Sequence, residues 1–164
     1  MKYRQIKTDF WQDGYISELT DKEKLFFIYL FTNDRVNMCG IYELPDKFML
    51  PTLGATLGEL ENMKQKMQKD NKYAFYKGWV FIINFADHNR YSSADNVVKA
   101  YLKEFNAIPA EILSYFTNTL CLEYCCPIES KVMVKVMVMD KYGRPYPRFE
   151  ARLDERVNPK DIPL

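Results

Sequence analysis

The stretch VNMCGIYELP (residues 36–45) decides the fold that the sequence predicts. It lies between the apolar run LFFIYLF (25–31) and the segment DKFMLPTLGATLGELENMKQKM (46–67), which both have helical character. Inside it, the β-branched and aromatic residues of GIYEL (40–44) predict a short strand. Because such a strand is not stable by itself, we expect partner strands elsewhere in the chain.

Two capping boxes mark the starts of helices on either side of this strand. The motif is a threonine followed three residues later by a glutamate, and it occurs as TDKE (20–23) and as TLGE (56–59). The first predicts a helix to about Thr32, and the second predicts a helix to about Asp70. Since the first helix contains a continuous apolar run, we expect it to be central to the core.

Shorter helices are expected before and between these two. The apolar residues of FWQDGYISEL (10–19) have the spacing of a short amphipathic helix. The Pro-Asp pair at 45–46 favours the start of another helix. Pro51 must shorten or kink that helix, because proline removes a backbone hydrogen bond. The Gly-Ala pair at 54–55 then predicts a tight connection to the next helix.

The missing partner strands are predicted in KYAFYKGWVFIINF (72–85). Two strand-like runs flank Lys77 and Gly78 there, which is the pattern of a β-hairpin. The predicted order is helix, strand, helix, tight turn, helix and hairpin, which is the order of a winged helix. We therefore expect an α+β fold, mainly helical, with a helix-turn-helix and a small three-stranded antiparallel sheet.

Three regions follow from this order. Residues 1–90 are expected to form a winged-helix DNA-binding domain, and residues 91–126 a helical extension that packs on it. Residues 127–164 are expected to form a poorly structured tail. The alternation of KVMVKVMVM (131–139) predicts a strand in this tail, although its repetitive composition also suits a low-complexity linker. A short helix is expected near residues 149–157.

The composition limits the class of protein. Aromatic residues make up 15% of the 164 residues and the net charge is +1, so we expect a folded chain whose overall charge favours neither nucleic acid nor membrane. Any basic surface must then be local. No apolar stretch approaches the roughly 20 residues of a membrane helix, and the start has no signal-peptide pattern. We therefore expect a cytoplasmic protein without a membrane partner.

Neither catalytic nor metal-binding patterns are evident in the sequence. The cysteines are Cys39, Cys121, Cys125 and Cys126, and their spacing fits no zinc motif, so we interpret them as small, partly buried thiols. His88 lies in the polar stretch ADHNRYSSADN (86–96), which we interpret as a loop because a nuclease needs further acids or a second histidine. No glycine-rich phosphate loop or histidine-paired nucleophile occurs. We expect no enzyme activity, no metal and no cofactor.

Four blocks of the sequence together resemble a known family. They are FWQDGYISEL (10–19), EKLFFIYLFTND (23–34), NMCGIYEL (37–44) and GWVFIINF (78–85). In this order they are similar to the N-terminal winged-helix domain of DnaD-like replisome organisers, which are replication initiation proteins of phages and prophages of Gram-positive bacteria. The resemblance covers roughly residues 1–125, since DNVVKAYLKEFNAIP (95–109) is similar to the helix that follows that domain.

The resemblance implies a function in phage or prophage DNA replication, inside the bacterial host cell. Such a protein binds double-stranded DNA at the origin, associates with itself, and recruits a helicase or helicase loader of the host or the phage. Pro51 departs from the family pattern, since it interrupts the helix before the turn. We expect the region that carries helicase or single-strand contacts in relatives to be absent or reduced to the tail.

The helix at 56–70 is the candidate recognition helix. Such a helix lies in the major groove with its early exposed residues at base edges. Helical periodicity places Leu57, Leu60, Met63 and Met67 on its buried side, with Lys64 near that seam, and Gly58, Asn62, Gln65 and Lys69 on the opposite side. The candidate DNA-binding residues are Asn62 and Gln65, which can pair with adenine, and Lys66, Lys69, Lys72 and Lys77, which can neutralise phosphates.

Other interpretations of the same residues stay open. Lysine, glutamine and asparagine also make an ordinary solvated helix face, and Glu61 would repel phosphates, whereas Glu59 serves the cap. An aromatic hairpin containing Trp79 is suited to stacking on bases, but also to a core or a dimer surface. The chain is alternatively a protein-interaction scaffold, with residues 131–139 as a strand edge that invites another chain, or a transcriptional regulator without a replication role.

Overall fold

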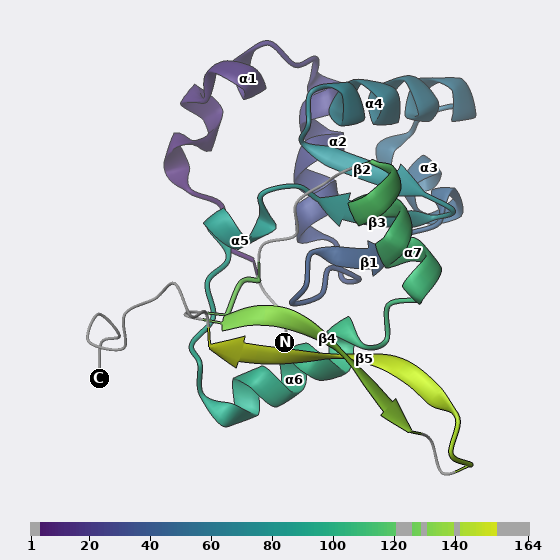
Figure 1. Ribbon diagram of the computed structural model, residues 1–164. Helices are drawn as coiled ribbons and strands as arrows, with labels where there is room; N and C mark the ends of the chain where they lie inside the picture. Colours follow the sequence, from purple (N-terminus) through teal and green to yellow (C-terminus); the bar gives the residue numbers. More distant parts are fainter. Residues whose placement is uncertain (1–3, 121–125, 129–130, 140–141, 154–164) are drawn as a thin grey trace. The chain divides into compact units, whose positions relative to one another are not determined.

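The computed structural model describes residues 4–120, 126–128, 131–139 and 142–153 (Figure 1). They form two compact units. Unit 1 comprises the described residues of 1–36 and 41–83, and unit 2 comprises 37–40 and the described residues from 84 onward. Helices and antiparallel strands occur in the chain, which confirms the predicted α+β class.

Unit 1 combines helices with a small sheet. Its helices are α1 (Gly14–Ser17), α2 (Asp21–Thr32), α3 (Asp46–Leu53) and α4 (Leu57–Lys69), preceded by a 3₁₀ turn, η1 (Thr8–Gln12). Its strands are β1 (Ile41–Glu43), β2 (Tyr73–Tyr76) and β3 (Trp79–Ile82). The strands pair antiparallel in the order β1-β3-β2, with Ile41 opposite Phe81. The predicted three-stranded sheet is therefore confirmed.

Both predicted capping boxes are present and fix the starts of α2 and α4. At the first, the Glu23 carboxylate accepts from the Thr20 N–H over 2.8 Å, and the Thr20 hydroxyl accepts from the Glu23 N–H over 3.3 Å. Thr56 and Glu59 repeat this arrangement with the same two distances. Because each box satisfies backbone donors that the helix itself leaves unpaired, the helix begins where the motif stands.

Helix α2 is less buried than the sequence predicts. Phe26 and Leu30 are fully buried, but Leu25 keeps 46% of its surface exposed. The expectation that the apolar run 25–31 lies at the centre of the core is wrong for that residue. The physical reason is helical rotation: Phe26 and Leu30 share one side of α2, where Phe26 stacks on Phe75, and Leu25 lies about 100° away from Phe26.

The predicted helix over residues 10–19 is broken into two turns. Asp13 separates η1 from α1 and has an extended backbone, with φ −63° and ψ 130°. Its carboxylate accepts from the N–H groups of Tyr15 and Ile16. Asp13 therefore caps a new helix and does not continue the preceding one.

Helix α3 contains Pro51 and still continues to Leu53, although it is only eight residues long. It ends at Gly54, whose φ of 55° is left-handed and favours a residue without a Cβ. The Ala55 N–H donates to the Leu50 carbonyl over 3.3 Å. This bond closes the tight connection from α3 to α4 that the sequence predicts.

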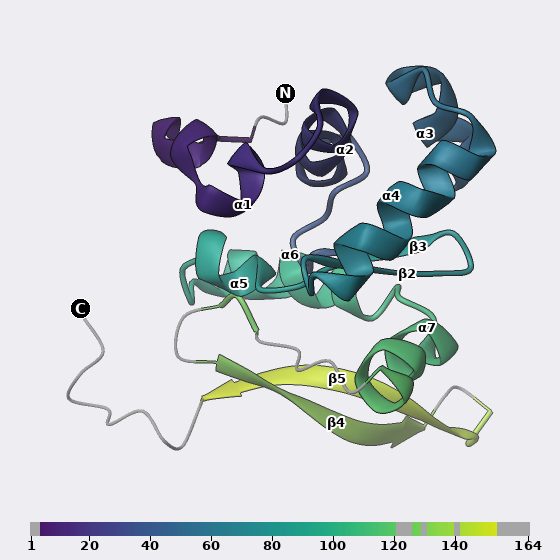
Figure 2. The same ribbon diagram turned by 90° about the horizontal axis from the view of Figure 1, so that it is seen from above.

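The β2–β3 hairpin turns at Lys77 and Gly78, as predicted. Both residues have positive φ, 46° and 76°, as a two-residue type I′ turn requires. The hairpin packs on α2, since Phe75 stacks on Phe26 with 6.0 Å between the ring centroids. Helix α4 crosses the same hairpin (Figure 2), and the Lys64 Nζ of α4 lies 5.9 Å from the centroid of the same Phe75 ring.

Unit 2 combines short helices with a second hairpin. Its helices are α5 (Phe85–His88), α6 (Asp95–Phe105) and α7 (Ala110–Ser114), with a π-helical turn, η2 (Tyr115–Thr119), directly after α7. Its strands are β4 (Lys131–Met139) and β5 (Pro145–Leu153), which pair antiparallel along their whole length. Fully buried large side chains of this unit include Tyr101, Phe116 and Ile128.

Two expectations for this unit are wrong. Residues 86–88 belong to α5, so the stretch 86–96 is not a loop throughout. Residues 145–153 form a strand where the sequence predicts irregular structure and the start of a helix. Pairing with β4 satisfies backbone groups of this segment, whereas Pro147 disfavours a helical interior. The remainder of the predicted helix, 154–157, and the cysteines Cys121 and Cys125 lie outside the described residues.

Candidate nucleic-acid interface

Helix α4 has one buried and one exposed side. Its buried residues are Leu60, Met63 and Met67, and its exposed polar side carries Gly58, Asn62, Gln65 and Lys69. Leu57 is 62% exposed, which corrects its predicted place on the buried side. At 100° per residue, Leu57 lies about 90° from the centre of the buried stripe, next to Glu61 and not above Leu60.

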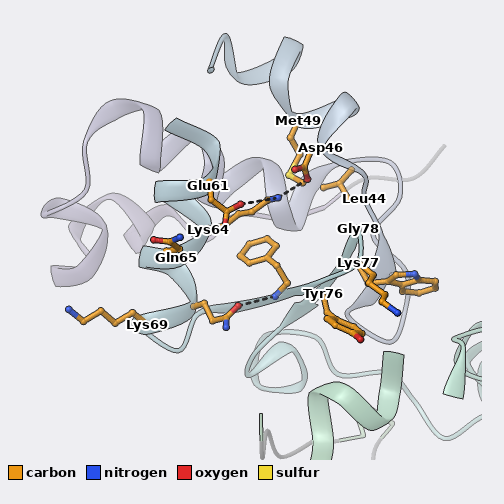
Figure 3. A pocket seen from close by; sticks show the side chains of 13 residues that line it. Leu44, Asp46, Met49, Glu61, Lys64, Gln65, Lys69, Tyr76, Lys77 and Gly78 are labelled. Carbon is orange, nitrogen blue, oxygen red and sulfur yellow. Dashed lines mark hydrogen bonds and ion pairs between the residues drawn. The ribbon is translucent and has the colours of Figure 1, made fainter. Parts of the chain in front are cut away.

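A groove separates α4 from the β2–β3 hairpin (Figure 3). It has a volume of about 650 Å³. Its lining comprises Leu44, Asp46 and Met49 at the start of α3, Glu61, Lys64, Gln65, Gln68 and Lys69 of α4, and residues 75–79 of the hairpin. Charged, amide and aromatic side chains thus meet in one open cleft of unit 1.

Several groups in this groove are engaged with one another. The Lys64 Nζ lies 2.6 Å from the Asp46 Oδ1, and only 13% of the Lys64 side chain is exposed. Its distance to the Glu61 carboxylate is 3.9 Å. The Gln68 side-chain oxygen accepts from the Phe75 N–H over 3.3 Å. Lys64 and Gln68 therefore hold α4 against α3 and the hairpin. The position of Lys64 agrees with its predicted place near the buried side of α4.

Three of the six predicted DNA-binding residues line the groove, namely Gln65, Lys69 and Lys77. Gln65 and Lys69 are exposed along α4, and Lys77 is exposed at the hairpin tip, where its Nζ lies 5.3 Å from the Tyr76 ring centroid. Asn62 is exposed on the adjoining polar side of α4. All four residues are exposed to solvent, and three of them line the same groove.

Lys66 and Lys72 are engaged elsewhere in unit 1. The Lys66 Nζ lies 2.9 Å from the Glu23 Oε1 and joins α4 to α2. The Lys72 Nζ lies 4.5 Å from the centroid of the Tyr15 ring, whose hydroxyl donates to Asp70 over 2.9 Å. Neither lysine lines the groove, so their predicted phosphate contacts would compete with these internal ones.

Two glutamates next to α4, Glu23 and Glu59, have lowered pKa values for different physical reasons. Burial alone would raise the pKa of Glu23, but hydrogen bonds from Lys66 and Thr20 leave it below its ordinary value. For Glu59, the hydrogen bond from Lys22 and those from Thr56 lower the pKa to about 2. Both carboxylates are therefore ionised and locally compensated at neutral pH.

Aromatic residues of the hairpin line the groove, although none of them is among the six predicted DNA-binding residues. Phe75, Tyr76 and Trp79 are among its lining residues, and Tyr76 is the direct pairing partner of Trp79. The signal was present in the sequence, since a two-residue turn at 77–78 makes the residues on either side of it cross-strand neighbours. Their partial exposure depends on how α4 crosses the hairpin, which no local pattern gives.

No protein-family model, curated protein or solved structure matches this chain. None of the helices in the described ranges is long and apolar enough to cross a membrane. Within the same ranges, no group of three or more histidine, cysteine, aspartate or glutamate side chains is arranged to hold a metal ion. The functional inference therefore depends on the geometry of unit 1 and on the sequence resemblance.

Proposed function

We propose that unit 1 is a winged helix that binds double-stranded DNA, with α4 in the major groove and the β2–β3 hairpin as the wing. The order α2, β1, α3, α4, β2 and β3 supports this, as does the sheet order β1-β3-β2. The tight connection at Gly54 gives α3 and α4 the sequence relationship of a helix-turn-helix.

The observation that carries the proposal is the open polar side of α4 beside the hairpin tip. Asn62 and Gln65 offer amides that match the adenine edge. Lys69 and Lys77 stand on the two walls of the groove, where they can neutralise phosphates of one DNA strand. Because the net charge is only +1, we expect the affinity to depend on these few cations and to fall steeply with salt.

The proposed biological role is origin binding in a phage or prophage replication module. This part of the proposal depends on the sequence resemblance to DnaD-like replisome organisers. It is tested by selecting the fragments of the source replicon that the full chain retains. Retention of origin fragments supports replication, whereas retention of promoter fragments alone supports a transcriptional regulator and contradicts the replication role.

The DNA-binding part is tested by fluorescence anisotropy with a labelled duplex at several salt concentrations. Lys69→Glu and Lys77→Glu should each weaken binding about tenfold or more at low salt, because each replaces an attraction by a repulsion. Lys66→Glu is a poor probe, since it would place two carboxylates together at Glu23. Lys99→Glu, on an exposed position of α6, is the matched control. Equal affinity of all variants would refute this interface.

A second candidate function is self-association through the β4–β5 hairpin. Among the described residues, no third strand continues this sheet, and β4 contains no proline, whereas β5 contains Pro145 and Pro147. An edge with a full set of backbone donors is suited to pairing with the same strand of a second copy. Light scattering on the full chain over a range of concentrations tests this, and a monomer throughout would contradict it.

A further inference from the structure

Two residues in the first two turns of α4 are more than half exposed. Glu61 differs from Glu59, which completes the cap at Thr56 and pairs with Lys22 at 2.7 Å. The Glu61 side chain is 54% exposed, and its nearest cation, the Lys64 Nζ at 3.9 Å, lies closer to Asp46. The Glu61 carboxylate thus keeps acceptor capacity toward solvent.

Leu57 is the second of these residues. It begins α4 and is 62% exposed, although leucine is among the residue types that are usually buried. It stands one helical turn before Glu61, so the two side chains are neighbours on the same stripe of the helix. An apolar group and a carboxylate therefore lie together in the first two turns of α4.

These positions are the ones from which a recognition helix reaches base edges. A carboxylate cannot favour phosphates, so in a DNA groove its matching partner is an exocyclic amino group. The cytosine N4 amino group has the guanine O6 acceptor on one side and only the cytosine C5–H on the other. The adenine N6 amino group lies between two acceptors, the adenine N7 and the thymine O4, which would repel a carboxylate. The thymine methyl is the one apolar group that a base presents in the major groove.

We propose that Glu61 and Leu57 determine sequence specificity, with Glu61 accepting from the N4 amino group of a cytosine and Leu57 contacting the methyl group of a thymine in the same site. The inference depends on the proposed function, since it requires α4 to enter the major groove. In this arrangement Asn62 and Gln65 still pair with adenine. The DNA site that the protein recognises therefore contains both C·G and A·T base pairs.

The test is selection from a pool of duplexes with a randomised centre, using the full chain and the variants Glu61→Gln and Leu57→Ala. The wild-type protein should select a motif with a fixed cytosine and a fixed thymine. Replacing that cytosine pair should weaken wild-type binding about tenfold, but binding by Glu61→Gln less than twofold. Leu57→Ala should lose the thymine preference and keep the cytosine preference. Glu18→Gln, an exposed residue of unit 1 outside α4, is the matched charge control and should select the wild-type motif.

The outcomes separate the two proposals. Binding without sequence preference, or one motif selected alike by the wild-type protein and both variants, overturns the specificity role and leaves DNA binding intact. Failure of the wild-type protein to bind any duplex overturns both. Both substitutions change exposed side chains, and circular dichroism with thermal unfolding establishes that each variant is folded before its motif is compared.

Discussion

The Lys66 Nζ lies 2.9 Å from the Glu23 Oε1 and joins α4 to α2. Glu23 is the same residue that completes the capping box of α2 with Thr20. One carboxylate therefore serves both a local helix start and a contact between two helices. The main role of Lys66 is therefore structural, because its charge is paired with Glu23 between the two helices.

We expect Lys66→Met to lower the free energy of unfolding by about 1 kcal/mol, because the pair is partly buried and Glu23 loses its partner. Glu23→Gln should cost a similar amount or more, since it also weakens the cap. Urea unfolding of both single variants and the double variant gives the coupling energy. Additive effects would show that the pair contributes nothing. Lys69→Met, an exposed position on α4, is the control and should stay within about 0.5 kcal/mol of wild type.

The stability of unit 1 should fall in acid, because the folded-state pKa values of Glu23 and Glu59 are depressed. For Glu59, hydrogen bonds from Lys22 and Thr56 lower the pKa to about 2. When the folded pKa lies below the unfolded one, the unfolded chain binds more protons, so stability is fully present above about pH 5 and lost towards about pH 2. Urea midpoints measured from neutral pH to pH 2 check this.

Glu59→Gln is the informative variant for this acid transition. Its midpoint should lie below that of the wild type by a constant amount above about pH 5, and the difference should shrink as Glu59 becomes protonated in the wild-type protein. A difference that grows towards low pH would have the wrong sign for a depressed pKa. It would mean that the contacts of Glu59 with Lys22 and Thr56 do not stabilise the folded state.

Gly40→Ala should destabilise unit 2 more than Gly54→Ala destabilises unit 1. Both glycines have positive φ, 70° and 55°, so each substitution costs about 1 kcal/mol or more in backbone strain. At Gly40 an added Cβ would also lie 2.7 Å from the Cβ of buried Phe85, whereas nothing lies within 4 Å at Gly54. Thermal unfolding of the two variants compares their losses of stability directly. Equal losses would contradict a steric clash between the added Cβ and Phe85.

The features that the sequence predicts well are those whose cause lies within a few residues. Thr20 and Thr56 begin helices because their capping partners stand three residues away, and the turn at 77–78 depends on two adjacent backbone conformations. The contact of Lys66 with Glu23 joins residues 43 positions apart, and it follows from how α4 packs on α2. No periodicity in either helix contains that information.

At the candidate site too, features with a local cause are predicted from the sequence, and features that depend on packing are not. The polar side of α4 is predicted by a 100° rotation per residue, and Asn62 and Gln65 are exposed accordingly. The same rotation puts Leu57 about 90° from the centre of the stripe formed by Leu60, Met63 and Met67, so its predicted place on the buried side is wrong and it is 62% exposed. Strand β5 is missed because its prolines favour irregular structure unless an alternating partner strand is at hand.

Trp79 should report the arrival of DNA in the groove. Trp79 lines the groove and is partly exposed, and the chain has one other tryptophan, Trp11, which is exposed near the N-terminus. In a Trp11→Phe variant, adding duplex DNA should change the emission of Trp79, because a DNA strand between α4 and the hairpin replaces water around the ring. A Trp79→Phe variant, which keeps Trp11, is the matched control and should respond little. A duplex that binds by anisotropy without changing the Trp79 emission would place the DNA on another surface and exclude the groove as its site.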